Sequence, residues 1–240
     1  MEQGRVVANE VEGGTRPLEA RSRAVSPFPA VVASLITVNA IVFFLLPVAF
    51  PSRFPYRRDS LGVLWGPLVF SGEWWRALTW SFVHFDFLHL FPNMLVLWVL
   101  GLRMERELGK CIFLFFYLAC GLIVALTLLT WHPYAASLGA SGAVCGVAGG
   151  VIVSYAPRVR SVSWSTRAKL GSLILFTGGL VATEFARGGL YLAHTTGLLA
   201  GMILCLFLIY VAKTQRGRYW TFALLAALLV TAATFIQRYH

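Results

Sequence analysis

Long apolar runs alternate with short polar segments along the chain, and the runs determine the expected fold. Several runs approach the roughly 20 residues that cross a bilayer as a helix, and the shorter ones can extend into their flanks. We therefore predict seven membrane-spanning helices, at residues 30–50, 91–104, 111–131, 143–156, 170–186, 190–211 and 220–236. The expected fold class is all-α, a polytopic membrane helix bundle.

The polar segments divide the chain into three parts. Residues 1–28 form a polar tail, with glutamates among its arginines and without the apolar core that a signal peptide needs. Residues 29–212 hold six predicted spans and should form one compact membrane domain. A basic linker, KTQRGR, opens residues 213–240 and sets the last apolar run apart, so we expect a seventh transmembrane helix added to a core of six.

Composition and charge support a membrane protein and argue against a nucleic-acid-binding protein. The chain is 58% hydrophobic and only 12% charged, which indicates a membrane protein. Its net charge of +10 could suggest a nucleic-acid partner. If the N-terminus is cytoplasmic, however, fourteen of the 20 Lys and Arg residues fall in cytoplasmic segments, as the positive-inside rule requires. The lipid bilayer explains this charge, and we expect no nucleic-acid partner.

The longest connection, at about residues 51–83, is rich in tryptophan. Trp74, Trp75 and Trp80 lie near Arg76, a composition that suits the headgroup boundary. We expect this segment to lie in the interface instead of crossing the membrane. An ordinary aromatic belt explains the composition about equally well.

Polar residues gather near the start of the second predicted span. Ionisable groups at membrane depth cost about 2.5 to 3.5 kcal/mol each, so His84 and His89 need an explanation. His89 and Asn93 are four residues apart and would share one face of a helix. Pro92 lies between them, and we expect the helix to begin close by, because a missing N–H costs little in a first turn.

Two glycine-rich stretches offer matching helix faces. GASGAVCGVAGG at 139–150 and AHTTGLLAG at 193–201 both have small residues at helical spacing, which allows close packing. Such packing would bring Ser141 and His194 together, as a nucleophile and its general base. The alternatives are that the glycines serve packing alone, that His194 is a structural hydrogen-bonding residue, or that the histidines and Asn93 line a transport path.

As a set, these residues resemble a rhomboid intramembrane serine protease over about residues 30–212. The resemblance rests on Trp75–Arg76, on His84, His89 and Asn93 at their spacing, on GxSG at 139–142, on AHxxGxxxG at 193–201, and on Asn39 and Glu105. It implies a rhomboid-like six-helix core, here with the expected additional C-terminal helix.

The resemblance also implies the roles of individual residues. Ser141 would be the nucleophile and His194 the general base. His89, Asn93 and the backbone N–H of Ser141 would stabilise the oxyanion, with Gly139 in the sharp turn before the serine and His84 as a supporting histidine. A helix that starts at Ser141 would direct its positive end toward the developing negative charge. Neither a cofactor nor a metal is implied. Cys145 departs from the pattern, because the family often has an aromatic residue there.

The function expected from these residues is hydrolysis of a peptide bond in or next to the transmembrane segment of another membrane protein. We expect a bacterial plasma membrane, with the N-terminus in the cytoplasm and the active site opening to the other side. The first alternative is a catalytically inactive rhomboid-like protein that binds membrane clients. The second is a transporter, which predicts polar residues spread through the midplane, whereas here they gather at one end.

Overall fold

The computed structural model describes residues 29–50, 60–155 and 191–211, with isolated positions at 164, 168, 171, 172, 223, 227, 230, 231 and 234. In this part of the chain the regular structure is helical, and β pairing is limited to one bridge between Leu64 and Ser137. The tail at 1–28 and the predicted spans at 170–186 and 220–236 lie outside the described residues, apart from the isolated positions.

Five of the predicted spans correspond to helices in the structure. They are α1 (Ala30–Ala49), α4 (Phe87–Leu108), α5 (Lys110–Trp131), α6 (Ser141–Tyr155) and α8 (Tyr191–Val211). The helices α1, α4 and α5, with residues Leu192–Ile209 of α8, are long and apolar enough to cross a membrane. The prediction of an all-α membrane bundle is therefore confirmed.

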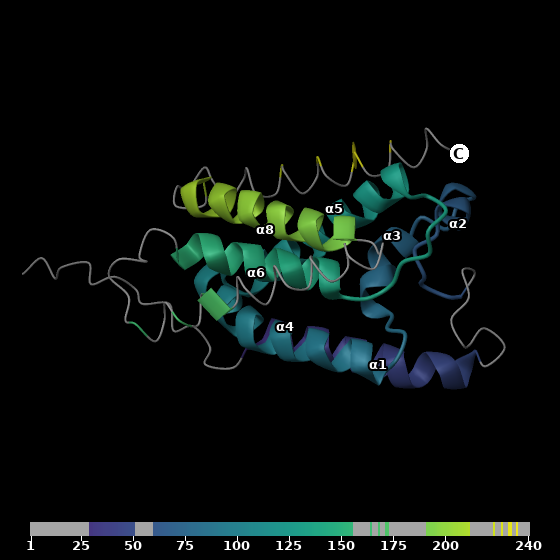
Figure 1. Cartoon of the computed structure of the whole chain (residues 1–240), viewed down its shortest axis with the longest axis horizontal. Helices are drawn as coiled ribbons and strands as arrows, with labels where there is room; N and C mark the ends of the chain where they lie inside the picture. The colour runs from purple at the N-terminus through teal and green to yellow at the C-terminus, as the bar shows by residue number, and fades with distance from the viewer. Residues whose placement is uncertain are drawn as a thin grey trace, which may run out of the picture.

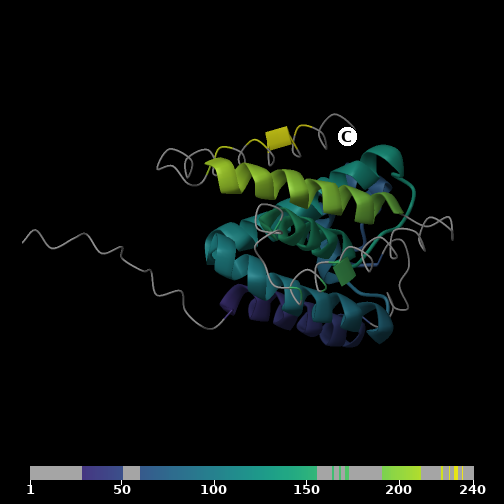
Figure 2. The ribbon, with the colours of Figure 1, turned by 60° about the vertical axis from the view of Figure 1, so that its left-hand side comes forward.

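Helix α6 lies at the centre of the bundle. In Figure 1 it runs between α8 and α4, and it packs on α5 as well. Figure 2 shows α8 and α1 on opposite sides of the bundle. Nearly every residue of α6 is buried, and its 15 residues span only about 22 Å, less than the roughly 30 Å of a hydrocarbon core. The described part of α6 is therefore shorter than the hydrocarbon core.

The contact between α6 and α8 depends on glycine. A Cβ atom on Gly197 would overlap the carbonyl oxygen of Gly142, and one on Gly201 would overlap that of Gly146. The two backbones therefore touch without side chains between them, as small-residue helix interfaces in membranes allow. The small-residue packing predicted from the sequence is confirmed.

Helix α1 is joined to α4 by a buried carboxylate. Glu105, which is 4% exposed, accepts hydrogen bonds from the backbone N–H groups of Val31 (3.2 Å) and Val32 (2.9 Å). These groups belong to the first turn of α1, where the helix itself supplies no acceptors. Glu105 therefore caps a helix more than 70 residues away in the chain.

The segment before α4 folds into three short helices, α2 (Gly66–Phe70), α3 (Arg76–Thr79) and η2 (Trp80–Phe82). Arg76 is fully buried, where its guanidinium donates to the carbonyl oxygens of Ser60 (2.6 Å) and Val63 (2.9 Å) and pairs with Glu73 (2.7 Å). Trp74 and Trp75 are exposed, as an interfacial segment requires. Arg76 and Trp80, in contrast, are buried and hold the segment together from inside.

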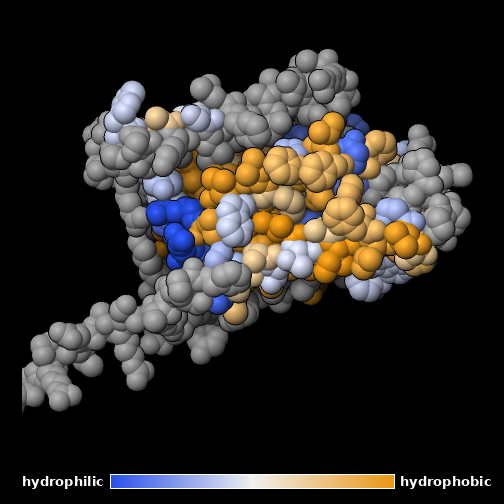
Figure 3. All heavy atoms as spheres, turned by 90° about the horizontal axis from the view of Figure 1, so that it is seen from below, coloured by the Kyte–Doolittle hydropathy of each residue, from blue (hydrophilic) through white to orange (hydrophobic). Residues whose placement is uncertain are grey.

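The outer surface is suited to lipid. A hydrophobic belt crosses the face shown in Figure 3, with hydrophilic residues toward its ends. Exposed apolar side chains on α1 and α4 include Ile41, Phe44, Leu95 and Val99. In water such a belt would be costly, whereas acyl chains solvate it without penalty.

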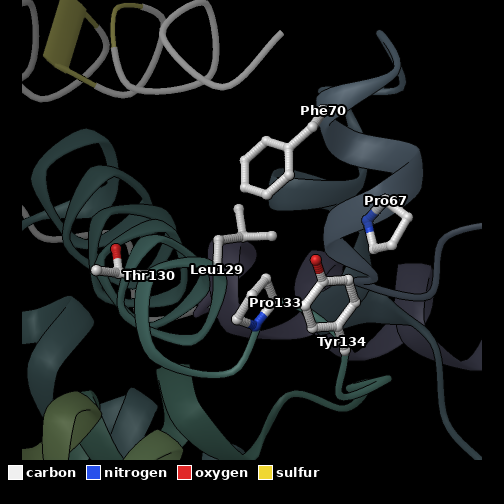
Figure 4. Close-up of a pocket in the computed structure, with 6 residues that line it drawn as sticks. All are labelled: Pro67, Phe70, Leu129, Thr130, Pro133 and Tyr134. Atoms are coloured by element: carbon white, nitrogen blue, oxygen red, sulfur yellow. The ribbon is translucent and has the colours of Figure 1, made fainter.

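A separate cavity of about 420 Å³ lies between α2 and the C-terminal end of α5 (Figure 4). It is lined by Pro67, Phe70, Leu129, Thr130, Pro133 and Tyr134. None of these is a predicted site residue, so this cavity is distinct from the cluster described next.

Candidate active site

The structure brings Ser141 and His194 into direct contact. Ser141 is the first residue of α6, and His194 lies in the first turn of α8. The serine Oγ is 2.8 Å from the histidine Nε2, within hydrogen-bonding distance. The two side chains are partly buried. The glycine contact between α6 and α8 makes this distance possible, because no side chain keeps the helices apart.

A sharp turn before α6 presents the serine. Gly139 has φ +116°, in the region that favours glycine, and its N–H donates to the carbonyl oxygen of Trp80 (3.0 Å). The next N–H, of Ala140, donates to Nε2 of His84 (3.3 Å). The segment before α4 therefore holds the turn at two successive backbone groups. Helix α6 begins at Ser141, as the resemblance implied, two residues before the start of the predicted apolar run.

His84 acts in this arrangement as a hydrogen-bond acceptor. Because Nε2 accepts from Ala140, the neutral ring carries its proton on Nδ1. His84 is fully buried, and its pKa is lowered to about 4, first by burial and then by the charge of His89. The ring therefore remains neutral, and remains an acceptor, at physiological pH.

His89 and Asn93 extend the cluster from α4. The His89 ring lies directly against Gly139, where an added Cβ atom would be 2.7 Å from the ring carbon Cε1 and 2.8 Å from Nε2. Asn93 is buried, and its Nδ2 donates to the backbone oxygen of His89 (2.7 Å). Only glycine at position 139 leaves room for the imidazole beside the turn.

The start of α4 differs from the expectation. The sequence predicted a helix beginning close to Pro92, but α4 begins at Phe87, and Pro92 is its sixth residue. At that depth the missing N–H leaves the Leu88 carbonyl without its usual helical partner. The N-cap is Asp86, whose carboxylate accepts from the His89 N–H at 2.7 Å. This cap was not predicted from the sequence, although an aspartate just before an apolar helix is a recognisable signal.

Trp80 supports the turn before Ser141 from inside the protein. It is 2% exposed, and a Cβ atom on Gly142 would lie 3.5 Å from its ring. The indole thus packs behind the turn that carries Ser141, and no local pattern indicated this. Cys145, one helical turn after Ser141, is 4% exposed.

Within the described residues, no group of three or more His, Cys, Asp or Glu side chains could hold a metal ion. The chemistry that the cluster offers is that of a serine hydroxyl beside an imidazole. Around it lie an asparagine amide, two further histidines and the N-terminus of a buried helix.

Comparison with known proteins identifies the family of the chain. The family model of the rhomboid domain matches residues 71–211. The chain is 35% identical over 124 residues to rhomboid protease GluP of Bacillus subtilis, which is 52% of this chain and 24% of GluP. It is 25% identical over 236 residues to rhomboid protease AarA of Providencia stuartii, covering 88% of this chain and 83% of AarA.

A plant relative is similar over part of the chain. RHOMBOID-like protein 6, mitochondrial, of Arabidopsis thaliana is 30% identical over 165 residues, 66% of this chain and 51% of that protein. The chain thus spans about a quarter of GluP and half of the plant protein, but most of AarA. The family model covers more than half of the chain and includes all the residues of the cluster. The protein therefore belongs to the rhomboid family, whose members are multi-pass helical membrane proteins.

Proposed function

We propose that this protein is an intramembrane serine endopeptidase. It would hydrolyse a peptide bond in or next to the transmembrane segment of another membrane protein. The observation that carries the proposal is the 2.8 Å contact between the Ser141 Oγ and the His194 Nε2 at the start of a buried helix. Residues 29–212 would form the catalytic membrane domain, with residues 213–240 as an addition to it.

In the proposed reaction, His194 Nε2 takes the proton of the Ser141 hydroxyl while Oγ attacks the scissile carbonyl carbon. The same proton then passes from His194 to the departing amine, and a water molecule repeats the sequence on the acyl-enzyme. The contact distance supports this role, because a general base has to lie about 2.6 to 3.2 Å from the proton donor.

The oxyanion would be stabilised by donors around the turn. The Ser141 N–H is in the first position of α6, where the helix offers it no acceptor. Asn93 Nδ2 uses one N–H on the His89 carbonyl, and a carboxamide nitrogen carries a second. His89 lies against Gly139, beside the same turn. The positive end of the α6 dipole adds to these donors.

Access to the serine limits the substrates. A transmembrane helix has its carbonyl groups engaged in hydrogen bonds, so it must unwind locally before Ser141 can reach one. We therefore expect substrates with helix-weakening residues near the membrane boundary. The charge distribution supports a cytoplasmic N-terminus and a site that opens to the opposite side of the membrane. A bacterial plasma membrane is the proposed location.

The test is cleavage of a transmembrane substrate in proteoliposomes by the full chain and by Ser141→Ala and His194→Ala. Each substitution should lower the rate at least about 10³-fold. Ser154→Ala and His132→Ala are matched controls: Ser154 lies on the same helix and donates to the Val151 carbonyl, and His132 is exposed at the end of α5. Cleavage that persists in Ser141→Ala would refute the proposal.

Covalent labelling distinguishes the inactive alternative, a protein that binds membrane clients without cutting them. A serine-directed fluorophosphonate should label the full chain and should fail to label Ser141→Ala. Absence of labelling in a folded full chain, with client binding intact, would favour the inactive alternative.

A further inference from the structure

Asp86 stands immediately before the helix that carries His89 and Asn93. Its backbone is extended, with φ −150° and ψ 177°, and its carboxylate oxygen Oδ1 accepts the His89 N–H at 2.7 Å. Its carbonyl oxygen accepts the N–H of Leu90 at 3.0 Å. Asp86 therefore supplies two acceptors to the first turn of α4, one from the side chain and one from the backbone.

The first turns of α4 are short of one hydrogen bond. Pro92 has no N–H, so the bond that would join residue 92 to the carbonyl of Leu88 cannot form. The segment from Phe87 to His89 is thus attached to the rest of α4 by fewer bonds than in an uninterrupted helix. A side-chain bond at its start has correspondingly more effect on its position.

Two groups of the candidate site depend on where His89 lies. Its carbonyl oxygen accepts from Asn93 Nδ2 at 2.7 Å, and its ring touches Gly139 and meets the His84 ring edge-on, with centroids 5.2 Å apart. A displacement of the His89 backbone would therefore move an imidazole and a carboxamide together.

We propose that Asp86 is a positioning residue for the oxyanion side of the site. Its carboxylate, by accepting the His89 N–H, compensates for the bond that Pro92 cannot donate to the Leu88 carbonyl. The inference rests on the proposed function. Asp86 touches no reacting atom in this scheme. It acts through the His89 N–H, which it holds in the register that places His89 and Asn93 beside the turn before Ser141.

The first experiment compares three substitutions at position 86 in proteoliposomes. Asp86→Ala removes the acceptor and should lower kcat about fivefold while KM stays within about twofold, because the groups affected act on the transition state. Asp86→Asn and Asp86→Ser keep an oxygen that caps helices and should restore kcat to within about twofold of the parent. Ser71→Ala, which removes a side-chain bond to the Leu68 carbonyl beside α2, is the matched control and should leave kcat unchanged.

The second experiment tests the link to Pro92. Pro92→Ala restores an N–H that can bond to the Leu88 carbonyl. In that background Asp86→Ala should lower kcat by less than half of its effect in the parent chain. If Asp86→Ala lowers kcat equally in the two backgrounds, the effect of Asp86 does not depend on Pro92, and that part of the proposal is overturned.

The remaining outcomes separate this proposal from the proposed function. If the full chain cleaves and Ser141→Ala does not, but Asp86→Ala cleaves at the parental kcat, Asp86 is not a positioning residue. A loss in Asp86→Ala that neither Asn nor Ser restores would also overturn it. Should no variant cleave, amide hydrogen exchange still tests the cap: faster exchange confined to residues 89–91 in Asp86→Ala, reversed in Asp86→Ser, supports it, and unchanged exchange refutes it.

Discussion

The close contact between α6 and α8 predicts that Gly197 cannot be replaced by alanine without loss of activity. A Cβ atom at this position would lie 2.9 Å from the Gly142 carbonyl carbon and closer still to its oxygen, whereas ordinary contacts begin near 3.4 Å. Because the oxygen is the closer atom, Gly197→Ala has to push the helices apart by about 1 Å beside Ser141.

The consequence for the proposed function follows from the length of the contact between Ser141 and His194. The Ser141–His194 distance is 2.8 Å, and a shift of 0.5 to 1 Å takes it beyond the roughly 3.2 Å reach of a hydrogen bond. Misplacement of catalytic groups by about 1 Å can cost about 100-fold. We expect kcat to fall about 10- to 100-fold, and the free energy of unfolding to fall by about 1 to 3 kcal/mol from overpacking.

The assay is cleavage of a fluorogenic transmembrane substrate at saturating concentration, with thermal unfolding measured on the same samples. Gly121→Ala is the matched control, because a Cβ atom there meets its nearest neighbour, Ala143 Cβ, at 3.7 Å. That helix substitution should leave kcat unchanged and leave stability equal or slightly higher. A folded Gly197→Ala protein with at least half of the parental kcat would refute the account of how the dyad is assembled.

Three further predictions concern the surroundings of the dyad. The pKa of His84 is about 4 in the folded protein and near 6.5 when unfolded, so the unfolded state binds the extra proton between these values. The free energy of unfolding should therefore be highest above pH 6.5, and protonation linked to His84 should lower it by on the order of 3 kcal/mol as the pH drops to about 4. Thermal unfolding measured across this pH range should lose that part of the pH dependence in His84→Gln. Asn93→Ala should lower kcat about 10²- to 10³-fold at unchanged KM in the cleavage assay, and an effect on KM alone would contradict an oxyanion role. Glu105→Ala removes the cap of α1 and should lower the unfolding temperature, whereas Glu105→Gln, which keeps one acceptor, should lower it less; equal losses would argue against capping.

Much of the fold could be predicted from the order of residues. The apolar runs predicted α1, α5 and α8 to within about a residue at each end, because a span of lipid thickness needs a continuous apolar stretch. The start of α4 was predicted too late because a proline is expected in a first turn, whereas Pro92 is the sixth residue of the helix. Its end was predicted too early because its last turn is charged and does not continue the apolar run.

The candidate site could be predicted where it depends on short sequence motifs. GxSG located the turn and the first residue of α6, and the glycine spacing located the face on which α8 packs. The proximity of Ser141 and His194 followed from these two features, although 53 positions separate the residues in the chain.

Tertiary structure alone decided which hydrogen bonds support that site and the helices around it. The Trp80 carbonyl and the His84 ring hold successive N–H groups of the turn, and Glu105 caps α1. These bonds join backbone groups to partners more than 50 residues away. Because every residue except proline has a backbone N–H, the sequence does not show which of these groups will bind a distant partner. The burial of Arg76 and Trp80 could not be predicted either. Both residue types are common at a membrane boundary, yet the folded chain encloses these two side chains. The sequence by itself determined the five apolar helices described above and the glycine faces that bring Ser141 and His194 together, because apolar length and glycine spacing act locally. The supporting contacts, in contrast, exist only once distant segments have packed.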